Sequence, residues 1–243
     1  MIFPVPAVVG ESNRLARGLR PWLLGLIGGD LLLLAVRVAH YPTFFSNSGA
    51  LTYLVEPVAA LVVYATVVGV LPSFTRRVAG APAAVRVGTV IGLLGGAIEL
   101  ADITLESLWS LPQPVVTLTT GVGMLALFAL FGVAGFLGGR RTRSFWLGPA
   151  TAIWCSMIAI LIAVTFGFLL VNLALPQLAH GATGDPDFRR SGWTDVRAFA
   201  IANTFDNGFT HLVEAPVIAT VLGAAGSGLG RLGVGTKRRA ENR

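Results

Sequence analysis

Six long apolar stretches constrain the fold of this chain more than any other feature. They fall at about 20–40, 51–71, 86–108, 115–139, 147–175 and 208–230. An α-helix needs about 20 apolar residues to cross the hydrocarbon layer of a bilayer, and each stretch is long enough. Only 12% of the residues are charged, against 54% that are hydrophobic. A soluble domain typically has about a quarter of its residues charged. We therefore predict an all-α integral membrane protein with a bundle of six transmembrane helices.

The basic residues predict the orientation of this bundle. Most of them precede the first stretch, follow the second, follow the fourth or follow the sixth: Arg14, Arg17, Arg20, Arg76, Arg77, Arg86, Arg140, Arg141, Arg143, Arg231, Lys237, Arg238, Arg239 and Arg243. The connections at 41–50 and 109–114 contain none. Because basic loops remain on the cytoplasmic side, both termini are predicted to be cytoplasmic. The expected organisation is a cytoplasmic segment at 1–19, a membrane domain at 20–230 and a basic tail at 231–243, in a bacterial cytoplasmic membrane.

The longest connection, 176–207, has no such bias. Its three arginines are balanced by Asp185, Asp187 and Asp195. The stretch 193–205 has two interpretations: a short amphipathic helix that lies in the membrane interface, or an ordinary solvated loop.

Similar short segments suggest an internal repeat. Gly-Leu-Ile-Gly-Gly at 25–29 is matched by Gly-Leu-Leu-Gly-Gly at 92–96, and Leu-Val-Glu-Pro-Val at 54–58 by Leu-Val-Glu-Ala-Pro-Val at 212–217. Three helical hairpins of the same sense would explain this, although apolar sequences also match by chance. Repeats of this kind are common in transporters. The small-xxx-small glycine spacing also predicts that the first and third helices cross closely.

Three carboxylates lie in the third apolar stretch, where each costs about 2.5–3.5 kcal/mol on insertion scales. They are Glu99, Asp102 and Glu106. At about 100° per residue they form a single stripe on one face of a helix. We expect such a stripe to face the interior of the bundle or a water-filled cavity.

Other polar groups are expected in the same outer half of the bundle. Arg37 ends the first helix, Glu56 begins the second, and His211 and Glu214 begin the sixth, while Asp30 lies deeper. Arg37 is the only fixed positive charge available, and one guanidinium satisfies only one or two carboxylates. The others must be protonated, bind a cation or face water. The predicted ion or substrate site therefore consists of Glu99, Asp102, Glu106, Glu56, Glu214, His211, Arg37 and Asp30.

The same residues also have less specific interpretations. Arg37 with Glu99 or Asp102 would form a structural buried ion pair, and Glu56 and Glu106 would be hydrated at the membrane surface. A divalent metal held by His211, Glu214, Glu99 and Asp102 is a further reading, although such spacings often occur by accident.

No cofactor is predicted. Cys155 is the single cysteine, which excludes a multi-cysteine metal site. No phosphate-binding loop or catalytic motif is present, so the catalytic residues are unknown. The basic clusters are explained by topology, so nucleic acid is not an expected partner.

The leading hypothesis is a small transporter or channel-like protein for protons, cations or a cationic solute. A second is a membrane enzyme acting on lipid or isoprenoid substrates, with paired carboxylates as acid and base. A third is a non-catalytic subunit or assembly factor of a larger complex. The expected partners are the lipid bilayer and either other membrane subunits or a second copy.

Overall fold

The computed structural model describes residues 8–109 and 112–241, and this part of the chain contains eight α-helices, one short 3-10 helix and no strand. The elements are α1 (Val8–His40), η1 (Pro42–Ser46), α2 (Ala50–Arg77), α3 (Ala81–Leu108), α4 (Gln113–Thr142), α5 (Leu147–Leu173), α6 (Leu175–Ala182), α7 (Pro186–Ser191) and α8 (Val196–Glu241). Six of them, α1 to α5 and α8, are long and apolar enough to cross a membrane. This confirms the predicted six-helix bundle of a multi-pass membrane protein. Residues 1–7 of the predicted N-terminal segment and 242–243 of the predicted tail lie outside the described residues.

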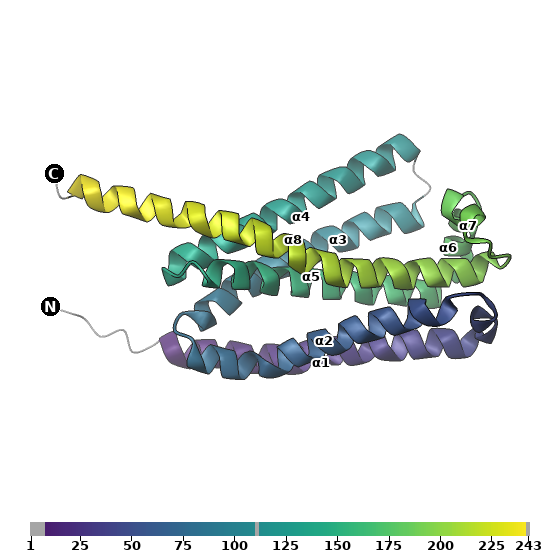
Figure 1. Ribbon diagram of the computed structural model, residues 1–243, viewed down its shortest axis with the longest axis horizontal. Coiled ribbons are helices and arrows are strands. Elements are labelled where there is room, and N and C mark those ends of the chain that lie inside the picture. The colour runs from purple at the N-terminus through teal and green to yellow at the C-terminus, as the bar shows by residue number, and fades with distance from the viewer. Residues whose placement is uncertain (1–7, 110–111, 242–243) are drawn as a thin grey trace.

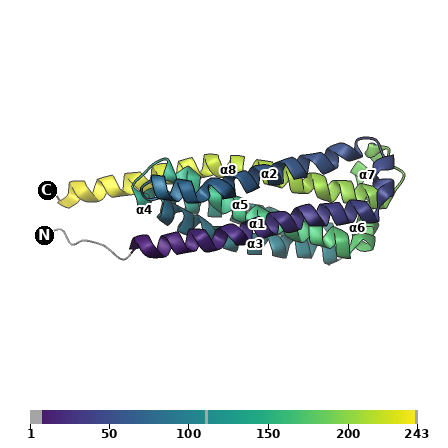
Figure 2. The same ribbon diagram turned by 90° about the horizontal axis from the view of Figure 1, so that it is seen from below.

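The long helices form three hairpins: α1 with α2, α3 with α4, and α5 with α8 (Figure 1). Helix α1 begins and α8 ends at one end of the bundle, while η1, α6 and α7 lie at the other (Figure 2). We call the end with η1, α6 and α7 the loop-rich end. The opposite end carries the α2–α3 and α4–α5 connections with Arg76, Arg77, Arg140 and Arg141, and we call it the basic end. That the basic end is cytoplasmic stays a prediction.

Helix α5 is the centre of the bundle. It contacts α1, α3, α4 and α8, and 67% of its span is buried, against 28% for that of α4. Its sequence contains no charged residue. A helix that is apolar on all sides is stable where other helices surround it, which explains this position.

The glycines of α3 pack against α5. A Cβ atom at Gly88 would lie 2.7 Å from the carbonyl oxygen of Thr151, and one at Gly92 would lie 2.6 Å from that of Cys155. The prediction that this glycine spacing serves a crossing with α1 is therefore wrong. Gly25 and Gly29 of α1 have no atom within 4 Å of such a position. The reason is the placement of α5, whose backbone occupies the close contact.

Helices α4 and α8 make close contact only toward the basic end. Gly135 of α4 packs directly on the backbone of Gly223 of α8. Farther toward the loop-rich end α4 becomes exposed: none of the residues from 112 to 126 whose burial is described is buried, whereas Leu127, Phe131 and Ala134 are. Figure 1 shows α3 and α4 diverging from α5 and α8 in the same direction. The four helices are thus joined tightly at one end and separate toward the other.

Helix α8 begins earlier than the sequence suggested. Asp195 precedes its first residue, and the Asp195 carboxylate accepts hydrogen bonds from the backbone N–H groups of Arg197 and Ala198. The expected start of the helix near residue 208 is wrong, and so is the interpretation of 193–205 as an ordinary solvated loop. Residues 196–205 are helical but continue into α8, and their location in the membrane interface stays a prediction. This segment supplies the first turns of α8 because Ala198, Ile201 and Phe205 are buried in the core.

Candidate functional site

The acidic stripe of α3 begins near the middle of the bundle and runs toward the loop-rich end. Gly96, one turn before Glu99, packs against Ile162, which lies near the centre of α5. The Glu99 side chain is buried, with 8% of its surface exposed. Asp102 is half-buried and Glu106 is exposed. The stripe therefore runs from a buried carboxylate to one at the surface.

Helix α4 accommodates the middle carboxylate of the stripe. The Thr120 hydroxyl donates a hydrogen bond to an Asp102 carboxylate oxygen over 3.4 Å. Gly123 lies beside it, and a Cβ atom at that position would be 3.5 Å from the Asp102 carboxyl carbon. The glycine thus leaves space for the carboxylate between α3 and α4. Sequence reasoning missed both residues, because neither type is distinctive in a membrane helix.

Helix α8 contributes a histidine to the same place. His211 interacts electrostatically with both Glu99 and Glu106. Its ring Nδ1 lies 2.9 Å from the carbonyl oxygen of Asn207. A carbonyl only accepts, so Nδ1 carries a hydrogen and donates it, and Nε2 takes no part in this contact. We call Glu99, Asp102, Glu106 and His211 the acid–histidine group.

Two of the predicted carboxylates lie outside this group. Glu56 of α2 is half-buried, Glu214 of α8 is exposed, and neither forms an ion pair in the structure. The prediction that His211 and Glu214 begin the last helix is wrong, because α8 begins at Val196. Gly208 packs on Phe168 and Gly223 packs on Ala152, so Glu214 lies near the level of the middle of α5.

Arg37 is not the counter-ion of the acidic stripe. Its guanidinium donates to the carbonyl oxygen of Val171 over 3.1 Å, and it lies 5.9 Å from the centre of the Tyr41 ring. Val171 is in the last turn of α5, where carbonyl groups have no partner within the helix and attract positive charge. The ion pair considered for Arg37 with Glu99 or Asp102 is not formed. Within the described parts of the chain, the only ion pair is the one between Asp187 and Arg190.

Asp30 forms a separate polar site between α1 and α5. Its side chain is completely buried, and neither carboxylate oxygen receives a hydrogen bond. The nearest polar side chain is that of Thr165, which interacts with it. Asp30 therefore does not join the acid–histidine group.

The residues considered for a metal do not assemble into a site. Within 8–109 and 112–241, no three of the His, Cys, Asp and Glu side chains are placed to share an ion. His211 interacts electrostatically with Glu99, but His211 and Glu214 both lie on the exposed surface of α8. The four-ligand set that the spacing suggested is not formed.

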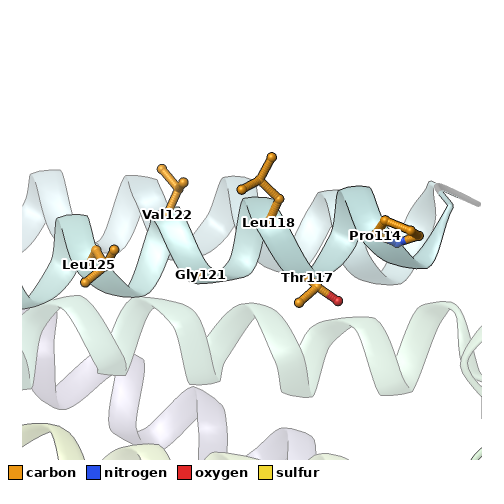
Figure 3. Close-up of a pocket in the computed structure, with 6 residues that line it drawn as sticks. All are labelled: Pro114, Thr117, Leu118, Gly121, Val122 and Leu125. Carbon is orange, nitrogen blue, oxygen red and sulfur yellow. The ribbon is translucent and has the colours of Figure 1, made fainter.

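A shallow groove runs along the part of α4 that diverges from α8 (Figure 3). It has a volume of about 450 Å³ and is lined by Pro114, Thr117, Leu118, Gly121, Val122 and Leu125. None of these side chains is ionisable, and Leu118 and Val122 project away from the ribbon of α4. The groove is mainly apolar and lacks an ionisable side chain, so the acid–histidine group remains the candidate for chemistry.

Comparison with known proteins adds no further assignment. No protein-family model matches the chain, and neither a curated protein nor a solved structure matches it. The function must therefore be argued from the site itself.

Proposed function

We propose that this membrane protein is a small transporter or channel-like protein for protons or other cations, and that the acid–histidine group is its ion site. The observation that carries the proposal is the absence of a fixed positive charge from this group. Two of its three carboxylates, Glu99 and Glu106, interact with one histidine, and Arg37 is bound to α5 instead. Such a group remains stable in a membrane only if it takes up protons, binds cations or meets water.

The placement of the group supports a path that opens at the loop-rich end. Glu99 is buried near the middle of the bundle, and Glu106 is exposed about two turns farther along α3. An ion that enters beside Glu106 would meet Asp102 and His211 before it reaches Glu99. Titratable groups spaced along one helix are the usual elements of a proton relay in pumps and transporters.

Ion flux into proteoliposomes tests the proposal. The purified protein is reconstituted with a pH-sensitive dye inside one set of vesicles and a sodium-sensitive dye inside another, and an outward potassium gradient with valinomycin supplies the driving force. We expect proton or sodium flux that is lost in the double variant Glu99→Gln with Asp102→Asn. Glu56→Gln is the matched control, because it removes a carboxylate outside the group. Equal flux for the wild type and the double variant would refute the proposal.

A second function has one specific observation in its favour. Glu214 is exposed at the level of the middle of α5, where a solitary bundle would present it to lipid. Charged side chains at that depth are rare unless another helix or water covers them. A subunit of a larger membrane complex would bury Glu214 against its partner. Purification in a mild detergent tests this: wild-type protein would elute with a partner, and Glu214→Leu would weaken that association.

A further inference from the structure

Asp30 occupies a position in α1 that would ordinarily be apolar. Over residues 18–40 of this helix, the buried positions are Leu23, Ile27, Asp30, Leu34 and Val38, spaced three and four residues apart. That spacing defines the face that α1 turns toward its neighbours. Asp30 is therefore part of the packed interface between α1 and α5, and its surroundings are closed to solvent.

The structure leaves Asp30 one neighbouring donor, Thr165, whose hydroxyl is bound elsewhere. Thr165 is the adjacent polar side chain, and its hydroxyl hydrogen is directed to the carbonyl oxygen of Leu161 over 2.8 Å. Asn172 donates instead to the carbonyl oxygens of Leu33 and Phe168, over 3.2 and 2.8 Å. An ionised Asp30 would thus be a buried charge whose one neighbouring donor, Thr165, is bound to Leu161, and such a poorly paired charge is among the most costly groups in a protein interior.

A neutral Asp30 fits the same surroundings. The Thr165 oxygen retains acceptor capacity, so a protonated Asp30 could donate to Thr165 while Thr165 keeps its bond to Leu161. The charged groups of the neighbouring helices do not alter this. Helix α5 has no charged residue, Arg37 is bound to Val171, and no ionisable group of α2 or α3 interacts with Asp30.

We propose that Asp30 is a proton-binding site, which holds its proton while α1 is packed on α5 and releases it only when the two helices separate. A proton suits the site better than a metal ion, because within 8–109 and 112–241 no His, Cys, Asp or Glu side chains gather with Asp30 to hold one. Release would leave a carboxylate that the closed interface cannot solvate. Proton occupancy is therefore coupled to the position of α1. The proposal rests on the packing of Asp30 and is independent of the function proposed for the acid–histidine group.

Infrared difference spectroscopy of the protein near neutral pH tests the protonation directly. We expect the wild type to show the carbonyl band of a protonated carboxylic acid that Asp30→Asn lacks. The band should persist in Glu99→Gln with Asp102→Asn, which separates this test from the flux measurement. In Thr165→Val, which keeps Asp30 but removes its acceptor, the band should shift to higher frequency. If Asp30→Asn instead removes the bands of an ionised carboxylate, the proposal is overturned.

Hydrogen–deuterium exchange tests the coupling to α1. We expect exchange in the wild type around residues 27–34 to increase with pH beyond the intrinsic chemical rate, because loss of the proton loosens the interface. Asp30→Asn mimics the neutral acid and should remove this extra dependence. Identical corrected exchange in the wild type and the variant at every pH would overturn the coupling. Should Asp30→Asn fail to fold, Asp30→Leu, which restores the apolar stripe, serves as the reference in both experiments.

Discussion

The Tyr41 phenol donates a hydrogen bond of 2.7 Å to the Asp195 carboxylate, which joins the end of α1 to the start of α8. The other oxygen of the same carboxylate accepts the backbone N–H groups of Arg197 and Ala198. One side chain therefore begins α8 and also holds the first helix in place. Around it, the rings of Phe44, Trp193 and Phe205 pack edge to face and complete the loop-rich end.

Tyr41→Phe should lower the free energy of unfolding by about 0.5–1.5 kcal/mol, the usual net value of one hydrogen bond. Asp195→Ala should cost more, since the cap of α8 is lost as well, and such caps contribute about 1 kcal/mol. Chemical denaturation in detergent measures both. Tyr53→Phe is the control, because the Tyr53 ring packs on Trp193 while its hydroxyl makes no hydrogen bond in the structure. An equal loss for Tyr41→Phe and Tyr53→Phe would contradict the assignment.

The same bond predicts a pH dependence. Partial burial and the hydrogen bond to Asp195 raise the pKa of Tyr41 above its ordinary value of 10.0. The folded state thus binds this proton more tightly than the unfolded state, so the stabilisation is complete below pH 10 and is lost as pH rises through the raised pKa. The effect is small because the side chain is largely solvated. The tyrosinate absorbance that Tyr41→Phe removes from the wild type reports the titration of Tyr41. The same subtraction in an Asp195→Asn background reports it without the carboxylate. We expect the midpoint in the wild-type background to lie at the higher pH. Equal midpoints in the two backgrounds would contradict the conclusion that the hydrogen bond to Asp195 raises the pKa of Tyr41.

Gly92→Ala tests the contact between α3 and α5. The new Cβ atom would lie 2.6 Å from the carbonyl oxygen of Cys155, so the two backbones must separate. We expect a loss of about 1–3 kcal/mol, as for overpacking elsewhere. Gly121→Ala in α4 is the matched control, since no atom lies within 4 Å of its new Cβ. Alanine is the better helix former by about 0.5–1 kcal/mol, so the control should be neutral or more stable. Thermal unfolding in detergent measures both, and similar melting temperatures would refute the contact.

Arg37→Met should destabilise the protein by about 1.5–3 kcal/mol, the range for a hydrogen bond to a charged group. Because Arg37 binds the end of α5 and not the acidic stripe, its effect should add to that of Glu99→Gln. Independent sites are additive within about 0.3–0.5 kcal/mol. A double-mutant cycle in denaturant measures the coupling, with Glu56→Gln replacing Glu99→Gln as the control pair. A coupling energy above about 1 kcal/mol would support the buried ion pair between Arg37 and Glu99 that the sequence suggested, and would contradict the separate placement of the two side chains.

The sequence predicts the bundle well and its internal pairings poorly. Apolar runs reveal each span because every residue contributes to the signal. The partner of a glycine such as Gly92 depends on which helix has come to lie beside it, and no local pattern records that. The same holds for Arg37: its neighbour Val171 contributes a backbone carbonyl, which is present at every position and so leaves no trace in the sequence. The stripe of Glu99, Asp102 and Glu106 was predictable, but Thr120 and Thr165 were not.

The orientation of the bundle can be determined with single cysteines. Cys155 is completely buried against α3, so it should not react with a membrane-impermeant maleimide and can remain in place. Gly184→Cys puts a thiol on the exposed α6–α7 connection, and Ala79→Cys puts one on the exposed α2–α3 connection. The positive-inside rule predicts that intact cells are labelled only at Gly184→Cys, and that Ala79→Cys reacts after permeabilisation. The reverse pattern would place the basic end outside. The acid–histidine group would then open toward the cytoplasm, and the proposed ion path would run from that side.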